Sequence, residues 1–363
     1  MTKGRGLTMA KHSHDGRPKT AHTYQSAAVP EATREKPACA QLSIVIPCYE
    51  EHECLPTLLE RTQATFGPTG IDYELVLVND GSRDGTWDLL ASYARAGAAR
   101  RVVAIDFSRN FGKESALLAG ITHAHGENVA IMDADLQQPP ETLLEMYHEL
   151  IAHPEVDCVA AFQRVRHEGR LQAALKEAFY RVFNAVTDPK ATMLPDASDF
   201  RVFRRPVAEA LLGMPEYHRF SKGLFAWVGF ETLPFPYEPS ERAAGQSKWS
   251  LRKLLAYALE GIFAFSTLPL RLATWVGSAC SVAAVIYFFV VLAETAHGKT
   301  PDGYPTIVCL ILLIGGLALL TLGIIGEYVA RIYVEGKDRP VYIARRVITA
   351  HDGNVVETGY ERN

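Results

Sequence analysis

The chain has 363 residues, of which 48% are hydrophobic, and a formal net charge of −4. This length accommodates two ordinary domains or one enzyme domain with membrane segments, and the nearly balanced charge argues against a protein that binds nucleic acid. The six cysteines form no C-x-x-C pair, so we expect neither a zinc site nor a disulfide framework.

The first 40 residues are polar and basic, and they contain no apolar run of the kind found in a secretory signal peptide. A segment of this composition buries too little apolar surface to fold by itself. We therefore predict that residues 1–40 form a disordered basic N-terminal tail.

Residues 42–162 alternate short apolar runs with helix-like segments, which predicts an α/β domain that we place at residues 41–250 with the less regular segment that follows. The runs are "LSIVI", "ELVLV", "RVVAI" and "NVAIM", each closed by a polar or Gly-rich turn. This alternation favours a mainly parallel, Rossmann-like sheet with helices on both faces. Ligands of such sheets bind at the carboxyl ends of the strands, which directs attention to residues 47–51, 79–86 and 133–140.

The segment "NDGSRDGT" (79–86) has the composition of a turn that leads into a helix. Asp84 and Thr86 are candidate caps of that helix. Asp80 ends an apolar strand where a ligand would lie, and its carboxylate is able to accept hydrogen bonds from a nucleobase or a ribose. We therefore treat Asp80 as a candidate nucleotide-binding residue.

The segment "DADLQQPPE" (133–141) is the strongest candidate for a metal site. Side chains at i and i+2 of an extended segment point the same way, so Asp133 and Asp135 converge, and Gln137 continues the register. Hard divalent cations such as Mg²⁺ or Mn²⁺ bind carboxylate oxygens and share their other positions with phosphates. The alternative is that Asp135 only caps a helix that starts near Pro139. The chain has no Rossmann glycine motif and no P-loop, so a metal-bridged diphosphate is the favoured ligand.

Cationic side chains cluster downstream of this segment, which indicates either a solvated face or a site for an anion near the bilayer. They are Arg164, Arg166, Arg170, Arg181, Arg201, Arg204, Arg205, Arg219 and Lys222. The loop "ERAAGQSKWS" (241–250), with Arg242 and Lys248, is either a membrane anchor or a lid over a diphosphate.

The C-terminal third predicts a membrane hairpin. Residues 273–293 and 306–326 contain no charged residue, and each spans about 30 Å as a helix. Basic residues flank the pair on the outside, whereas the connecting loop has only Lys299, so the catalytic domain and both termini are expected in the cytoplasm. Residues 251–272 predict amphipathic helices at the membrane interface. Residues 327–363 form the expected cytoplasmic C-terminal tail, whose strand-like alternation would suit docking on a neighbouring subunit.

Taken together, these motifs resemble family 2 glycosyltransferases of the polyprenyl-phosphate type, a group that includes bactoprenol glucosyltransferases and dolichyl-phosphate mannose synthase-like enzymes. The resemblance covers roughly residues 42–346 and rests on "SIVIPCYEE", "VNDGSRDGT", "DFSRNFGKESALLAGITHAHGENVAIMDADLQQPPE", "DASDFRVFRR", "RFSKGLFAWVGF", "RAAGQSKW" and "LGIIGEYVARIY". It implies a GT-A fold, location in the cell membrane, and inverting transfer from a nucleotide sugar, most simply UDP-glucose, to a polyprenyl phosphate such as undecaprenyl phosphate. It also implies Mg²⁺ or Mn²⁺ as cofactor and is compatible with a homo-oligomer such as a tetramer.

The resemblance also implies roles for individual residues. Asp199 matches the acidic residue that acts as base or orients the acceptor, and Asp135 is assigned to catalysis with it. The nucleotide-sugar site would comprise Pro47, Tyr49, Glu51, Asp80, Asp133, Arg242 and Lys248. The metal site would comprise Asp133, Asp135 and Gln137, and the acceptor phosphate site Arg164, Arg181, Arg201 and Arg219. Asn79 departs from the family pattern, in which an aspartate is common, and this leaves its contact with nucleotide or metal in doubt.

Three alternatives remain open at this point. In the first, the enzyme catalyses the same reaction with GDP-mannose, UDP-GlcNAc or a UDP-aminoarabinose derivative as donor, since no residue identifies the sugar. A processive polysaccharide synthase is disfavoured because its Q-x-x-R-W signature is absent and only two spans are found. A non-catalytic membrane scaffold is disfavoured because it would not need a complete carboxylate motif.

Overall fold

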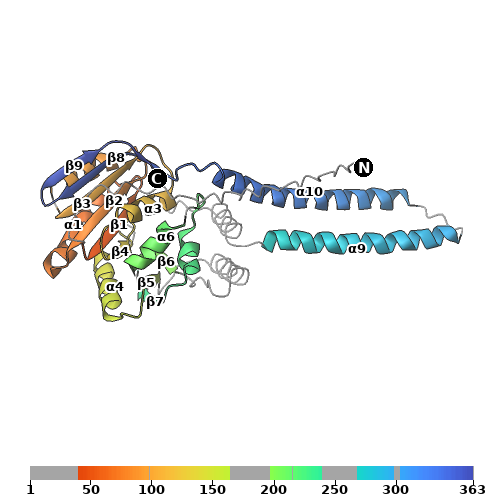
Figure 1. The fold of residues 1–363 in the computed structure, drawn as a ribbon, viewed down its shortest axis with the longest axis horizontal. Helices are drawn as coiled ribbons and strands as arrows, with labels where there is room; N and C mark the ends of the chain where they lie inside the picture. The colour runs from red at the N-terminus through yellow and green to blue at the C-terminus, as the bar shows by residue number, and fades with distance from the viewer. Residues whose placement is uncertain are drawn as a thin grey trace, which may run out of the picture. The chain divides into compact units, whose positions relative to one another are not determined.

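The computed structural model describes residues 40–97, 99–163, 197–214, 216–238, 268–297 and 303–362 (Figure 1). The predicted N-terminal tail, the interface helices over 251–267 and the loop 241–250 lie outside these residues. The expectations placed on Arg164, Arg181, Arg242 and Lys248 lie outside them too.

One sheet forms the centre of the folded domain. Its strand order is β10-β8-β3-β2-β1-β4-β6-β5-β7, with β9 paired to β8. The strands are β1 (Leu42–Cys48), β2 (Tyr73–Asn79), β3 (Arg101–Phe107), β4 (Asn128–Ile131), β5 (Cys158–Gln163), β6 (Ala197–Arg204), β7 (Thr232–Tyr237), β8 (Ile343–His351), β9 (Asn354–Thr358) and β10 (Glu361–Arg362).

The first four strands are parallel, as predicted. In register, Leu42 of β1 lies between Tyr73 of β2 and Asn128 of β4. Beyond this group, β6 joins β4 and β8 joins β3 in antiparallel fashion, so the sheet as a whole is mixed rather than mainly parallel. The reason is that both strands return to the sheet from segments that the alternating pattern of residues 42–162 does not include.

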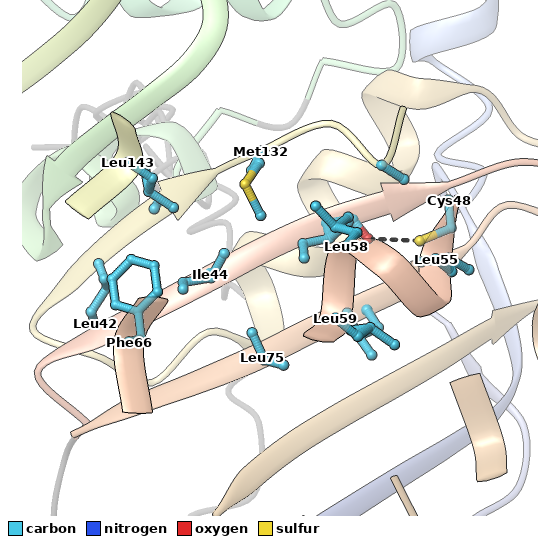
Figure 2. Packing of buried hydrophobic residues seen from close by; sticks show 14 of the residues in the cluster. Leu42, Ile44, Cys48, Leu55, Leu58, Leu59, Phe66, Leu75, Met132 and Leu143 are labelled. Carbon is cyan, nitrogen blue, oxygen red and sulfur yellow. Dashed lines mark hydrogen bonds between the residues drawn. The ribbon is translucent and has the colours of Figure 1, made fainter. Parts of the chain in front are cut away.

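Two layers of helices cover the sheet. One apolar core contains side chains of α1 (Leu55–Phe66), α2 (Thr86–Arg95) and α4 (Pro140–Ala152). The other contains side chains of α3 (Lys113–His123), α6 (Arg205–Leu212) and α7 (Ser221–Trp227). Strand β1 is apolar except for the buried Ser43 because its residues enter both cores, and Figure 2 shows its Leu42, Ile44 and Cys48 packed against α1.

Helix α3 packs so closely on the sheet that only glycine fits at position 120. A Cβ built there would lie 2.2 Å from Cγ1 of Val45, which is buried in β1 and stiff at χ1. We expect Gly120→Ala to cost about 1–3 kcal/mol of stability through overpacking. Thermal unfolding of the detergent-solubilised full-length protein should show a lower Tm, whereas Gly359→Ala, where a Cβ meets nothing within 4 Å, should leave Tm unchanged. Equal Tm values for both variants would contradict this packing.

Two long apolar helices follow the described part of the domain. They are α9 (Leu268–Ala296) and α10 (Tyr304–Glu335), which lie side by side (Figure 1). Each contains a window of 23 residues that is long and apolar enough to cross a membrane. Both helices extend past the predicted spans 273–293 and 306–326, because flanking residues such as those of "LPLRL" and "EYVARIYVE" also suit a helix.

After α10 the chain returns to the sheet. Strand β8 pairs with β3, and Tyr342 stacks on Phe107 with ring centroids 5.0 Å apart. The predicted strand-like alternation of the C-terminal tail is thus correct, and β8 pairs with β3 of its own chain, while docking on a neighbouring subunit stays a prediction. The strand β8 pairs there because β3 would otherwise be an unpaired edge of the sheet.

Candidate functional site

The loops that follow β1 and β2 are bound to each other at the carboxyl edge of the sheet. The backbone N–H of Glu50 donates to Ser82 Oγ at 2.9 Å, and that of His52 donates to Asp84 Oδ2 at 3.2 Å. Asp84 Oδ1 accepts from both the backbone N–H and the hydroxyl of Thr86, the first residue of α2. Gly85 is the N-cap residue of α2, so Asp84 is not the cap that the sequence predicts but binds the first helical residue from one position further upstream. The two hydrogen-bonded loops form a rim at this edge, where Tyr49 is 41% exposed.

Asp80 anchors a third loop to this rim. Its Oδ1 accepts from the backbone N–H of Phe111 at 2.7 Å, and its Oδ2 accepts from that of Gly112 at 3.0 Å. Burial raises the pKa of Asp80 to about 6 although these two N–H groups oppose the shift. The loop before α3 lies so close that a Cβ at Gly81 (φ +67°) would be 2.4 Å from the carbonyl carbon of Arg109. The described role of Asp80 is thus to hold the loop before α3, and nucleotide binding by this residue stays a prediction.

Asn79 is buried and connects the rim to the C-terminal strand. Its Nδ2 donates to Asp106 Oδ1 at 2.8 Å, and Asp106 Oδ2 accepts from Arg346 Nη2 at 2.7 Å. An aspartate at position 79 would place a second buried carboxylate beside Asp106. The departure of Asn79 from the family pattern therefore has a structural explanation within this chain.

The acidic loop after β4 shows the alternation that the sequence predicts. Asp133, Asp135 and Gln137 are partly exposed, whereas the residues between them are buried. Helix α4 starts at Pro140 with no side-chain cap, and Asp135 Oδ1 instead accepts from the backbone N–H of Gln137 at 3.1 Å. This excludes the alternative in which Asp135 only caps α4. Residues 134–138 form turns and bends, with Leu136 at φ +64°, so the loop is not the extended segment that the sequence predicts, and a common ligand for the three side chains stays a prediction.

A residue that the sequence analysis missed fixes Asp133. Gln138 is buried, its Oε1 accepts from the backbone N–H of Asp133 at 2.7 Å, and its Nε2 donates to Asp133 Oδ2 at 3.0 Å. The two bonds hold the carboxylate in one orientation. The only signal in the sequence was a second amide next to Gln137, with no indication that it is buried.

Asp199 reaches the same site from β6. This strand runs antiparallel to β4, with Arg201 opposite Ile131, so the start of β6 meets the end of β4. Asp199 therefore lies near the acidic loop although the two are distant in sequence. The spacing of residues in the sequence does not predict that Asp199 lies near the acidic loop, because this proximity depends on the antiparallel pairing of β6 with β4.

Lys113 joins Asp199 to the acidic loop. Its Nζ lies 2.6 Å from Asp133 Oδ1 and 3.1 Å from Asp199 Oδ2. Burial opposes the charged form, but the two carboxylates raise the pKa of Lys113 above its usual range. Lys113, Lys222 and Arg201 in turn hold the pKa of Asp199 well below its usual range, so Asp199 is ionised at neutral pH. Lys113 is the most informative site residue that the sequence analysis missed.

The two described arginines that were assigned to the acceptor phosphate contact protein groups. Arg201 is buried, donates from Nε to Ser198 O at 3.0 Å, and lies 4.4 Å above the ring of Phe225. Arg219 donates to the carbonyls of Leu211 and Met214 at the end of α6, and burial lowers its pKa. Their acceptor role stays a prediction.

Glu114 is a carboxylate that the sequence analysis also missed, and it links α3 to α7. Its Oε2 accepts from the backbone N–H of Ser221 at 3.0 Å and from the Ser221 hydroxyl. Burial and then the charge of Asp199 raise the pKa of Glu114 to about 7, despite the donors of Ser221. Glu114 therefore titrates near neutral pH, under the influence of the Asp199 charge.

This shift makes stability depend on pH. Because the folded protein binds the Glu114 proton more tightly than the unfolded chain, the resulting stability is present below about pH 4.5 and is lost as the pH rises through about 7. We expect the free energy of unfolding of the wild type to fall more between pH 5 and pH 8 than that of Glu114→Gln, by at most about 3 kcal/mol, and the Tm of the wild type to fall more accordingly. Parallel Tm profiles for the two proteins would contradict the shift.

The residues of the acidic loop suit a divalent cation. Carboxylate and amide oxygens, such as those of the partly exposed Asp133, Asp135 and Gln137, are the hard ligands that Mg²⁺ and Mn²⁺ select. Within the part of the chain that the structure describes, no three His, Cys, Asp or Glu side chains gather around one point. These protein oxygens alone would not complete the coordination of a cation. They therefore suit a cation that also binds oxygens of a bound ligand, and do not form a site closed by protein groups alone.

The described residues combine a mixed sheet, an acidic loop at the carboxyl edge of its parallel strands, and two apolar helices long enough to cross a membrane. The family model "Glycosyl transferase family 2" matches residues 43–212, and the model "GtrB C-terminal hairpin" matches residues 268–332. The chain belongs to glycosyltransferase family 2, and the predictions of a glycosyltransferase and of a GT-A α/β domain with a two-helix hairpin are confirmed.

The chain is similar to curated relatives over nearly their whole length. An uncharacterised glycosyltransferase of Synechocystis is 41% identical over 307 residues, which cover 84% of this chain and 94% of the relative. The prophage bactoprenol glucosyl transferase homolog of Escherichia coli is 37% identical over 85% of this chain and 99% of its own. The bactoprenol glucosyl transferase of Shigella phage SfII is 37% identical over 86% and 99%.

Proposed function

We propose that this glycosyltransferase moves glucose from UDP-glucose to a polyprenyl phosphate such as undecaprenyl phosphate at the cytoplasmic face of the cell membrane. The observation that carries the proposal is that Asp133 and Asp199 meet at Lys113, at the carboxyl edge of the sheet of a chain with two membrane-length helices. Relatives named as bactoprenol glucosyl transferases, similar over nearly their whole length, support this acceptor and this sugar.

On the donor side, the rim formed by the loops after β1 and β2 would bind the nucleotide. The proposed nucleotide-binding residues lie in these loops or at the end of the preceding strand: Pro47, Tyr49, Glu51 and Asp80. Asp133, Asp135 and Gln137 would hold Mg²⁺ or Mn²⁺, which when bound would neutralise the charge of the leaving diphosphate. Arg242 and Lys248 are proposed to contact the same diphosphate.

On the acceptor side, the nucleophile needs little activation. A phosphate monoester has a second pKa of about 6, so it is largely dianionic at neutral pH. Asp199 is ionised and fixed by Lys113, which suits a group that orients the acceptor. Arg164, Arg181, Arg201 and Arg219 are proposed to offset the charge of the acceptor phosphate. Attack from the side opposite the diphosphate would invert the anomeric carbon and give a β-linked product from an α-linked donor.

The hairpin would keep the site next to the lipid. With α9 and α10 as spans, the basic residues beyond both ends favour a cytoplasmic catalytic domain and an outer loop at 297–303. A membrane-bound acceptor phosphate then meets the site at a high local concentration.

A donor panel tests the proposal. The full-length protein in detergent, given undecaprenyl phosphate and Mn²⁺, should transfer label from UDP-glucose into chloroform-extractable lipid. Parallel reactions with GDP-mannose, UDP-GlcNAc and a UDP-aminoarabinose derivative test the other donors. Transfer from one of these donors, and not from UDP-glucose, would show that the proposed sugar is wrong. Absence of transfer from every donor would favour a non-catalytic scaffold.

A further inference from the structure

Lys113 lies between the donor motif and the acceptor carboxylate. Its Nζ is 2.6 Å from Asp133 Oδ1 and 3.1 Å from Asp199 Oδ2, and its side chain is 42% exposed. We propose that Lys113 is a positioning residue that joins Asp133 to Asp199 before the donor binds, and that it leaves Asp133 but stays with Asp199 when a divalent cation binds the acidic loop. The inference deepens the proposed function and rests on it.

Lys113 stands at a helix position where a positively charged side chain is unfavourable. Lys113 is the first residue of α3, where the partial positive charge of the helix end disfavours a cation. The backbone just before it is fixed, because Asp80 accepts from the N–H groups of Phe111 and Gly112. A residue that breaks a local rule on a rigid backbone is typical of a functional site.

Both oxygens of Asp133 are already engaged. Oδ2 accepts from Gln138 Nε2, which belongs to a buried side chain bound to Asp133 twice, and Oδ1 accepts from Lys113. A divalent cation needs a carboxylate oxygen as a direct ligand, and an ammonium group on that same oxygen would repel it. Gln138 is buried and bound to Asp133 twice, whereas the long side chain of Lys113 is 42% exposed. We therefore expect Lys113, and not Gln138, to leave Asp133 when the cation binds.

Asp199 is the contact that Lys113 keeps. Without an ammonium group between them, Asp133 and Asp199 would be two neighbouring carboxylates that repel each other. Lys222 and Arg201 also act on the charge of Asp199, but Lys113 is the cation that forms ion pairs with both carboxylates. Removal of Lys113 should therefore have two effects of opposite sign: easier cation binding and slower transfer.

The test compares Mn²⁺ binding with transfer. Free Mn²⁺ is measured by electron paramagnetic resonance during titration of the detergent-solubilised full-length protein without donor or acceptor. We expect the Kd for Mn²⁺ to fall about 5- to 100-fold in Lys113→Met. We expect kcat for transfer to fall about 10- to 100-fold, with a smaller change in KM for the donor, because Asp199 is no longer positioned. Lys113→Arg keeps the charge and should bind Mn²⁺ nearly as the wild type does.

Two further variants control for misfolding and for the loss of a positive charge elsewhere on the domain. Lys113→Gln keeps a polar side chain and should show the same two effects if Lys113→Met fails to fold. Arg61→Met removes an exposed ion pair with Glu141 and should change neither measurement. Unchanged or weaker Mn²⁺ binding in both Lys113 variants would overturn the exchange at Asp133, and unchanged kcat would overturn the positioning of Asp199.

The test also separates this inference from the proposed function. The Mn²⁺ titration needs neither sugar nor lipid, so it reports on Lys113 even if the wild type transfers nothing to polyprenyl phosphate. Absence of lipid-linked product from the wild type, together with tighter Mn²⁺ binding by Lys113→Met, would overturn the proposed acceptor and the positioning of Asp199 and retain the exchange at Asp133.

Discussion

Asp135→Asn should reduce sugar transfer about a thousandfold or more while the protein stays folded and membrane-bound. The substitution keeps the shape of the side chain and its Oδ1, which accepts from the backbone N–H of Gln137, but it removes one of the two partly exposed carboxylates of the loop. Loss of the charge that neutralises a leaving diphosphate is worth about 4 kcal/mol in the transition state. The rate of label transfer into extractable lipid measures the effect.

A matched control and a metal test sharpen this prediction. Glu141→Gln removes an exposed carboxylate from the first turn of the following helix and should retain wild-type transfer. Excess EDTA should stop the wild type, and added Mn²⁺ should restore it. Transfer by Asp135→Asn at the wild-type rate, in the presence of excess EDTA, would refute the assignment of this loop to a metal.

Asp199→Asn should lower kcat about 10- to 100-fold by a factor that is the same at every pH between 6 and 9. The pKa of Asp199 is held well below its usual range, so the carboxylate is a weak base and its charge does not change in this interval. The loss then comes from misplacement of the acceptor, for which an effect of this size is ordinary. The pH–rate profiles of the wild type and the variant should be parallel.

The opposite outcome has a distinct meaning. Partial recovery of Asp199→Asn at high pH would show that Asp199 removes a proton from the acceptor, which would contradict the orienting role. Asp88→Asn, which alters an exposed carboxylate in the first turn of α2, serves as the control and should leave the profile unchanged.

The parallel core of the fold and the donor loop were predictable from local patterns. Strands β1 to β4 are continuous apolar runs closed by turns, and such runs report burial on both faces of a parallel sheet. The exposure of Asp133, Asp135 and Gln137 between buried neighbours was expected for an extended chain, but residues 134–138 form turns and bends and Leu136 has φ +64°, so a turn produces the alternation instead. The two membrane-length helices follow from length and hydrophobicity.

The contacts between distant segments were not predictable in this way. The meeting of Lys113 with Asp133 and Asp199 depends on three separate elements: the start of α3, the end of β4 and the antiparallel start of β6. The burial of Gln138 and the burial of Arg219 against α6 depend on side-chain packing. Periodicity and spacing carry information about one element at a time, so they identify the residue types of this site but not their partners.

The stoichiometry of one reaction tests the central claim most directly. The full-length protein in detergent is given UDP-glucose, undecaprenyl phosphate and Mn²⁺. The mass of the lipid product is measured by mass spectrometry, and the amounts of lipid product and released UDP are quantified. The proposed function predicts one UDP released for each lipid formed and a product mass equal to the polyprenyl phosphate plus one hexosyl residue, which is a hexose less one water. UDP release with free glucose in the aqueous phase, or a lipid that carries a sugar chain, would contradict it.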